Sequence, residues 1–199
     1  SVNSAGMGNV GIAHADVRNV FHNPAFAGLK ESHYEISHIK WLPNLTDDMG
    51  YQSMLHTSDM GWSGEIFYFD YGTQVEADAG GIVLGDFESA SFRMSGGYGF
   101  GFNDWLVGAR LNFYHHNFVD DIDIGMNYGF DIGAYKEFGN TSVGIVLKDV
   151  GGDTEILEQT LNLPTSIGVG VGQKFGNFTL ASDVKVFEDY NSIGIGGEY

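Results

Sequence analysis

The sequence predicts an all-β protein: an antiparallel meander of about ten strands that forms a complete or partial transmembrane-type β-barrel around an N-terminal plug segment. Three observations predict this class. Short alternating segments follow one another with turn residues between them. The 199 residues include 30 glycines, 14% aromatic residues and only three prolines. The two faces of the expected strands also differ in chemistry. We expect a plug segment at residues 1–30 and an antiparallel β-barrel-type domain at residues 31–199.

The N-terminal segment differs in kind from the remainder because it has no sustained alternation. It is rich in glycine and alanine and ends in Phe21-His22-Asn23-Pro24-Ala25. Gly6-Met7-Gly8-Asn9-Val10-Gly11 matches the dinucleotide-binding pattern, but that site needs a buried strand before the glycines and a helix after them. Only five residues precede Gly6, and none of them reads as part of a buried strand. We therefore expect the glycines to permit a tight backbone path in a plug whose motif residues are Gly6, Gly8, Asn23, Pro24 and Ala25.

The first three strands are expected at residues 32–41, 50–57 and 62–71. Pro43-Asn44 breaks the chain after the first of them, and Asp59-Met60-Gly61 forms a turn after the second. The acidic and glycine-bearing residues 73–88 are expected to form a long loop, with or without a short strand at residues 82–84.

The alternation is sharper in the second half of the chain. Turn signals at Asn103-Asp104, Gly139-Asn140 and Gly176-Asn177 separate the segments. The seven strands expected here lie at residues 89–100, 105–114, 124–135, 142–148, 166–172, 178–186 and 193–199. We expect a polar loop at residues 115–123, and a second loop at residues 151–163 that either is irregular throughout or includes one helical turn at residues 155–158.

One face of these strands carries large apolar side chains, whereas the other carries small and polar ones. Glycine weakens a strand unless another backbone must approach it closely. We therefore expect the small face to point inward onto the plug and the apolar face to meet lipid. Aromatic residues near strand ends would then lie at the level of the headgroups. The charged residues expected to point inward, and to pair with one another or with the plug, are Arg93, Arg110, Asp131, Lys148, Asp183 and Lys185.

Composition excludes several classes of function. The chain has 9 basic and 26 acidic residues, a net charge of −17, which argues against binding to nucleic acid or to an anionic membrane surface. It has no cysteine, so it has neither disulfides nor thiolate chemistry. No apolar run approaches the ~20 residues of a transmembrane helix, whereas a transmembrane strand needs only ~9–11.

Residues with catalytic or metal-binding chemistry are present but lack the spacing that such sites need. Asp120, Asp121 and Asp123 are a calcium candidate, although they lack the spacing of an EF-hand loop. His115 and His116 point to opposite faces, as do His33 and His38, which disfavours joint chelation. Ser63 lies in Gly-Trp-Ser-Gly-Glu, which departs from the nucleophile-elbow pattern. We expect no enzymatic activity, cofactor or metal.

Several segments resemble the PorV/PorQ family of outer-membrane β-barrels, which are related to the FadL fatty-acid transporters. The most specific is the N-terminal block, with Ser4-Ala5-Gly6-Met7-Gly8 and then His22-Asn23-Pro24-Ala25 within residues 19–29. Weaker matches are distributed along the whole chain. They are Gly85-Asp86-Phe87-Glu88-Ser89-Ala90, Val146-Leu147-Lys148-Asp149-Val150-Gly151, residues 163–170 and the terminal Gly196-Gly197-Glu198-Tyr199.

The resemblance implies an outer-membrane location in a Gram-negative-type bacterium, a plugged barrel and a part in type IX protein secretion or cell-surface attachment. The implied partners are outer-membrane lipid and proteins: secretion machinery, cargo or further copies of the chain. Family members usually continue beyond the segment that matches Tyr199, so this sequence represents either a truncated form or a short relative that closes differently or assembles with other chains. Two alternatives stay open: a structural subunit of an extracellular or cell-surface assembly, and FadL-like transport of a hydrophobic small molecule.

Overall fold

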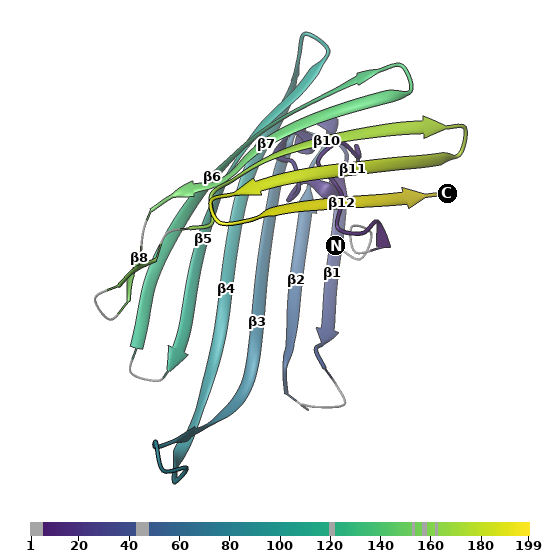
Figure 1. The fold of residues 1–199 in the computed structure, drawn as a ribbon. Helices are drawn as coiled ribbons and strands as arrows, with labels where there is room; N and C mark the ends of the chain where they lie inside the picture. Colours follow the sequence, from purple (N-terminus) through teal and green to yellow (C-terminus); the bar gives the residue numbers. More distant parts are fainter. Residues whose placement is uncertain (1–5, 43–47, 120–121, 153, 157–158, 162) are drawn as a thin grey trace.

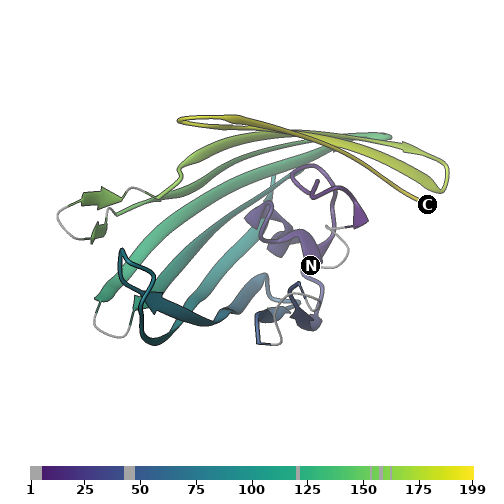
Figure 2. The ribbon, with the colours of Figure 1, turned by 60° about the horizontal axis from the view of Figure 1, so that its bottom comes forward.

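The computed structural model describes residues 6–42, 48–119, 122–152, 154–156, 159–161 and 163–199. A curved sheet dominates the fold, and the N-terminal segment lies within its concave side (Figures 1 and 2). Between Met7 and Lys30 that segment contains two short 3₁₀ helices, η1 (Val17–Asn19) and η2 (Pro24–Leu29).

Ten antiparallel strands in the described part of the chain form the main sheet, in the order β1-β2-β3-β4-β5-β6-β7-β10-β11-β12. Their bounds are β1 (His33–Lys40), β2 (Gly50–Thr57), β3 (Trp62–Ala77), β4 (Val83–Phe102), β5 (Trp105–Val119), β6 (Ile122–Phe138), β7 (Thr141–Gly151), β10 (Ser166–Phe175), β11 (Phe178–Phe187) and β12 (Asn191–Glu198). Among the described residues, the strands β8 (Thr154–Ile156) and β9 (Gln159–Leu161) pair only with each other. The expected ten-stranded meander is therefore confirmed.

Three expected loops are corrected by the structure. The loop expected at residues 73–88 is largely strand, because β3 continues to Ala77 and β4 begins at Val83. The polar loop expected at residues 115–123 is mostly the ends of β5 and β6. Within residues 151–163, Glu155 and Ile156 lie in β8, so the helical-turn alternative is wrong there; residues 157–158 lie outside the described residues. In each case alternation was masked by polar or small residues, although backbone pairing continues through them.

The outer face of the sheet is apolar and exposed. Along β10 the outward side chains Ile167, Val169 and Val171 are about half exposed, whereas the residues between them are buried. The same alternation recurs in β4, β5 and β7. An apolar surface of this extent is unusual for a water-soluble monomer and marks a surface that another phase or molecule covers.

The core lies between the N-terminal segment and the inner face of the sheet. Phe26 is fully buried and packs edge-on against Tyr135 of β6, with ring centroids 5.1 Å apart. Val20 packs with Leu55 of β2, and Val10 packs with Ala181 of β11. Hydrophobic burial thus anchors one short segment to strands near both ends of the sheet.

The sheet is open. Within the described part of the chain, β1 pairs only with β2, and β12 pairs only with β11. Both strands therefore expose unpaired backbone groups along one edge. None of the helices among the described residues is long and apolar enough to cross a membrane.

Candidate functional site

The candidate site comprises the plug, defined as described residues 6–30, and the inner wall that it contacts. Local sequence shapes the plug. The side chain of Asp16 caps η1 by accepting a hydrogen bond from the backbone N–H of Arg18, whose guanidinium also pairs with this carboxylate. Burial tends to raise the pKa of Asp16, but its hydrogen bonds from Arg18 outweigh that effect and lower it. Lys30 adopts a left-handed conformation and ends η2.

Asn23 joins three parts of the molecule. Its carbonyl oxygen accepts from the backbone N–H of Ala25 and caps η2, while Pro24 occupies the first turn. Its amide nitrogen donates to the carbonyl oxygens of Ile12 at 3.0 Å and of Ala134 in β6 at 3.1 Å. The side chain is fully buried. The Asn-Pro-Ala motif therefore connects two parts of the plug to each other and to the inner face of the sheet.

Glycines on the inner face let the plug backbone touch the sheet backbone. A Cβ atom at Gly108 of β5 would overlap the Pro24 carbonyl group, and one at Gly144 of β7 would overlap the Ile12 carbonyl group. In contrast, a Cβ atom at Gly96, on the outer face of β4, would meet nothing within 4 Å. The inner face therefore carries glycine because larger residues would overlap the backbone of the plug.

The glycines that match the dinucleotide-binding pattern differ in their surroundings. Gly8 has a φ of 65°, and a Cβ atom there would lie 2.7 Å from the Ile195 oxygen of β12. Gly6 is exposed, with open space where a Cβ atom would lie. No regular helix follows Gly11 within residues 12–16, so the described residues lack the arrangement that a dinucleotide site requires.

Asp183 of β11 anchors the start of the plug. Its Oδ2 accepts hydrogen bonds from the backbone N–H groups of Gly11 at 2.7 Å and Ile12 at 3.0 Å, and the residue is 2% exposed. Lys148 of β7 donates from Nζ to the Phe21 carbonyl oxygen at 2.9 Å. Lys185 lies 3.5 Å from the Asn9 carbonyl oxygen. These three inward charges therefore contact plug backbone.

Arg110 of β5 and Asp131 of β6 form a buried pair next to the plug, with Nη2 3.2 Å from Oδ2. Asp131 also accepts from the backbone N–H of Asp149 at 2.8 Å, at a point where the register between β6 and β7 shifts. Asp149 has a φ of 56°, and its carboxylate accepts from the Tyr114 hydroxyl group. The pair thus stabilises a β-bulge that faces the interior.

The expectation for Arg93 is corrected. Arg93 of β4 pairs with Glu65 of β3 at 2.8 Å, and not with Asp131, Asp183 or the plug. Glu65 is only 7% exposed, so the ion pair with Arg93 compensates a carboxylate that would otherwise be buried without a counter-charge. The sequence carried a signal for this pair, because a charged residue at an inward position of an apolar strand needs a partner.

His22 is the titratable group of the plug that burial affects most. Its ring packs where a Cβ atom of Gly11 would lie. Burial, reinforced by the nearby charges of Lys185 and Lys148, holds the pKa of His22 well below its usual value of 6.5. Sequence reasoning did not single out this residue, since a histidine in a motif gives no signal of its burial.

The remaining candidates for chemistry do not form a site among the described residues. Asp120 and Asp121 lie outside them, and of Asp123 the structure describes only the backbone in β6. Ser63 is the second residue of β3 and pairs with Gly97 of β4, so it lies in a paired strand and not on a nucleophile elbow. Within the described ranges, no three histidine or carboxylate side chains are grouped so that they could hold a metal ion.

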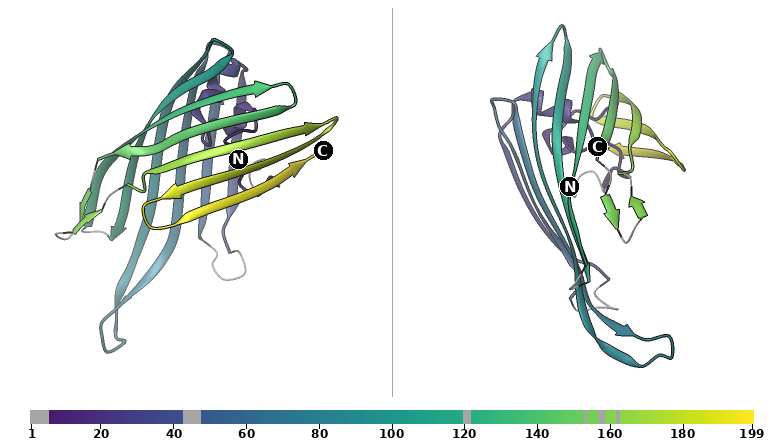
Figure 3. Two further views of the ribbon diagram at one scale, coloured as in Figure 1. Left: turned by 45° about the horizontal axis from the view of Figure 1, so that its top comes forward. Right: turned by 90° about the vertical axis from the view of Figure 1, so that its left-hand side faces the viewer.

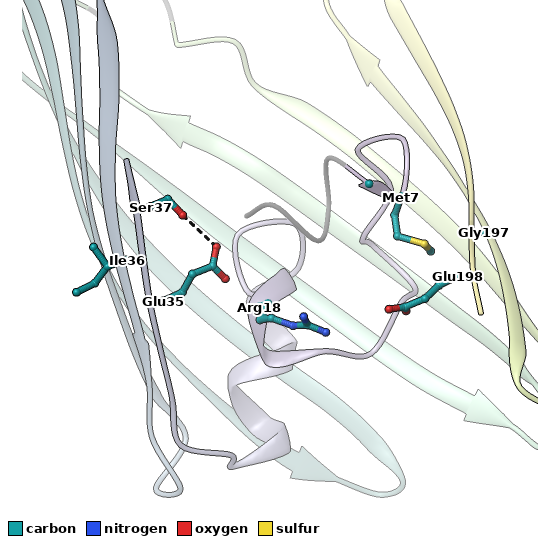
Figure 4. A pocket seen from close by; sticks show the side chains of 8 residues that line it. Met7, Arg18, Glu35, Ile36, Ser37, Gly197 and Glu198 are labelled. Carbon is teal, nitrogen blue, oxygen red and sulfur yellow. Dashed lines mark hydrogen bonds between the residues drawn. The ribbon is translucent and has the colours of Figure 1, made fainter. Parts of the chain in front are cut away.

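A cleft of about 570 Å³ separates the two edges of the sheet (Figure 4). Glu35 of β1 lies on one side and Glu198 of β12 on the other, and Arg18 of the plug lies between these strands. The plug also reaches the β12 side through His14, whose Nε2 lies 3.2 Å from the Glu198 carboxylate. We call this gap the lateral opening.

Comparison with known proteins assigns no family. A scan against protein-family models finds no match, and neither does a search of curated proteins.

Proposed function

We propose that this chain is a non-catalytic outer-membrane β-barrel protein of PorV/PorQ type that acts in protein secretion or cell-surface attachment. The observation that carries the proposal is the contrast between the faces of one sheet: an exposed apolar exterior and a polar, glycine-lined interior against which a plug is docked. In a transmembrane barrel, lipid covers the apolar exterior, and the plug fills the polar interior.

The band of apolar side chains has boundaries that suit a membrane. At one end, the apolar band stops at a row of residues that pair across adjacent strands, just beyond the last outward aromatic residues. This row consists of Lys40, Gly50, Asp70, Ala90 and Asn117. At the other end lie the polar turns at residues 103–104, 139–140 and 176–177. Outward Tyr68 and Phe92 flank the first boundary, and Phe102 and Trp105 lie next to the second. Aromatic residues at both interfaces are typical of transmembrane barrels.

Within this proposal the lateral opening is where the barrel closes, because strand edges with unsatisfied N–H and C=O groups are costly in hydrocarbon. Further strands would pair with β1 and β12 and cover the cleft between Glu35 and Glu198. The plug already contacts both flanking regions, through Leu55 of β2 and Glu198 of β12. It therefore holds the two ends of the open sheet in place.

The experiment that tests this function removes the gene from its bacterium and compares the secreted and surface-exposed proteins of mutant and parent. Loss of exported proteins from the surface, restored by the wild-type gene, is expected. A gene encoding Asp189→Asn, a change in the exposed β11–β12 turn, should restore export as fully as the wild-type gene. An unchanged set of exported proteins, with the protein in detergent-independent particles, would contradict the proposal and favour a structural assembly.

One observation favours transport of a hydrophobic small molecule as a second candidate. Away from the plug, the inner wall carries an aromatic patch on β2 and β3, where Tyr51 lies 5.5 Å from Phe67 and 6.4 Å from Phe69 between ring centroids. Arg93 lies over the Phe67 ring at 5.3 Å. Uptake of a fatty acid into vesicles that contain the protein, lost on Phe67→Ser but not on Phe92→Ser of the outer face, would favour transport over secretion.

A further inference from the structure

The hairpin that joins β3 and β4 extends far beyond the rest of the sheet (Figures 1 and 3). We call residues 73–88 the ribbon. Pairing of β2 with β3 ends at Asp70, and pairing of β4 with β5 ends at Ala90. Between these points the strands pair only with each other in the described part of the chain, from Thr73↔Glu88 to Ala77↔Val83. The ribbon therefore has two free strand edges.

The ribbon has a defined shape at both ends. At its base the backbone N–H of Thr73 donates to the Asp48 carboxylate at 2.8 Å. At its tip the Asp78 side chain accepts from the backbone N–H groups of Gly80 and Ile82, each at 2.9 Å. Such side-chain bonds fix a turn. However, an isolated two-stranded hairpin is marginally stable in water, and a third strand or a packed face is what normally stabilises it.

The exposed side chains of the ribbon indicate what could cover it. Val75, Ile82, Val83 and Leu84 are each 60–66% exposed, and because Val83 and Leu84 are successive residues of β4, both faces of the ribbon present apolar surface. Four exposed carboxylates border this surface, those of Glu76, Asp78, Asp86 and Glu88. No lysine or arginine occurs between Lys40 and Arg93, so nothing in the ribbon itself neutralises these charges. The chemistry fits a ligand that is both apolar and basic.

Charge also decides between possible occupants. A second copy of this chain would bring 26 acidic against 9 basic residues, and an anionic membrane surface would repel the carboxylates. We propose that the ribbon is a docking site for an extended, basic and apolar segment of another protein, which adds to a free edge as a third strand. Backbone pairing would supply affinity, and alternating side chains would supply specificity.

The test uses a short capped peptide of alternating valine and lysine, with a valine–glutamate peptide as its control, and the detergent-purified full chain. The lysine peptide is expected to bind and to protect amides of residues 73–77 or 83–88 from hydrogen exchange. The double variant Val83→Thr/Asp86→Asn should weaken binding about tenfold, because it removes one apolar contact and one charge pair. Threonine retains strand propensity, so the ribbon should still form.

The matched control is Asp104→Asn, which removes an exposed carboxylate from the β4–β5 turn, beyond the opposite end of β4, and should leave binding unchanged. Raising the salt concentration should weaken binding of the lysine peptide. Equal binding of both peptides, no effect of the double variant, or protection confined to β1 or β12 would overturn the proposal. Protection of the ribbon by a bilayer without peptide would also overturn it and assign the ribbon to the membrane.

Discussion

The inner face of the sheet and the ribbon have the same antiparallel pairing, but the first is covered by the plug and the second is exposed. Against the plug, every inward position of β10 from Ser166 to Gly172 is small and buried. In the ribbon, from Thr73 to Ala77 on β3, every residue is exposed. The residue type at a strand position therefore depends on what packs against that position. An exposed apolar segment with nothing packed against it indicates that a binding partner covers it.

The largest effect is expected from Gly108→Ala. The new methyl group would overlap the Pro24 carbonyl group, so the plug must shift, at a cost of about 3 kcal/mol in the free energy of unfolding. Gly96→Ala on the outer face is the matched control and should be neutral or stabilising by about 0.5 kcal/mol. Denaturant titration of both variants measures the difference, and equal values for the two would contradict the packing account.

Asp183→Ala should have the next largest effect. Oδ2 of Asp183 accepts hydrogen bonds from the backbone N–H groups of Gly11 and Ile12 in a buried position, so removing this acceptor should cost about 2 kcal/mol. Limited proteolysis should then cleave the plug faster than in the wild type. Asp189→Ala, in the turn of the same hairpin, should leave the cleavage rate unchanged; equally fast cleavage in both variants would mean that Asp183 is not an anchor.

Acid should weaken plug docking through His22. Its pKa in the docked state lies well below 6.5, so the undocked state takes up the proton first as the pH falls. Docking is therefore unaffected above pH 6.5 and loses about 1 kcal/mol between pH 6.5 and 5.5, above the range in which carboxylates titrate. Protection of the plug from proteolysis reports this loss. His22→Gln should remove this dependence; a variant that keeps it would show that another group titrates.

The smallest effect is expected in the ribbon. Val83 is 63% exposed, so Val83→Thr should change the free energy of unfolding by no more than about 0.5 kcal/mol. Ala181→Thr, at a buried inward position of β11, is its counterpart in the plug-covered region and should destabilise the protein clearly. A Val83→Thr variant as destabilised as Ala181→Thr would mean that the ribbon is already packed against something.

The sequence predicted an all-β antiparallel meander of ten strands and the side chains that lie on each face of the sheet, because alternation and turn residues are local signals. It did not predict the length of β3 and β4, since the ribbon has no buried face to enforce alternation. It placed Arg110, Asp131, Lys148 and Asp183 on the inner face but could not assign their partners. Those partners depend on register, as the pairing of Arg93 with Glu65 shows.

The central claim is that one face of the sheet meets lipid and the other meets the plug. Because the chain has no cysteine, single cysteines at Val169 and Thr179 can carry a spin label without other substitutions. These positions lie on the outer face of β10 and on the inner face of β11. In a bilayer, the account predicts that relaxation at residue 169 responds to oxygen and not to a water-soluble nickel reagent, and that residue 179 shows no lipid signature. A nickel response at residue 169 as strong as at an exposed turn such as Asp189 would contradict the account.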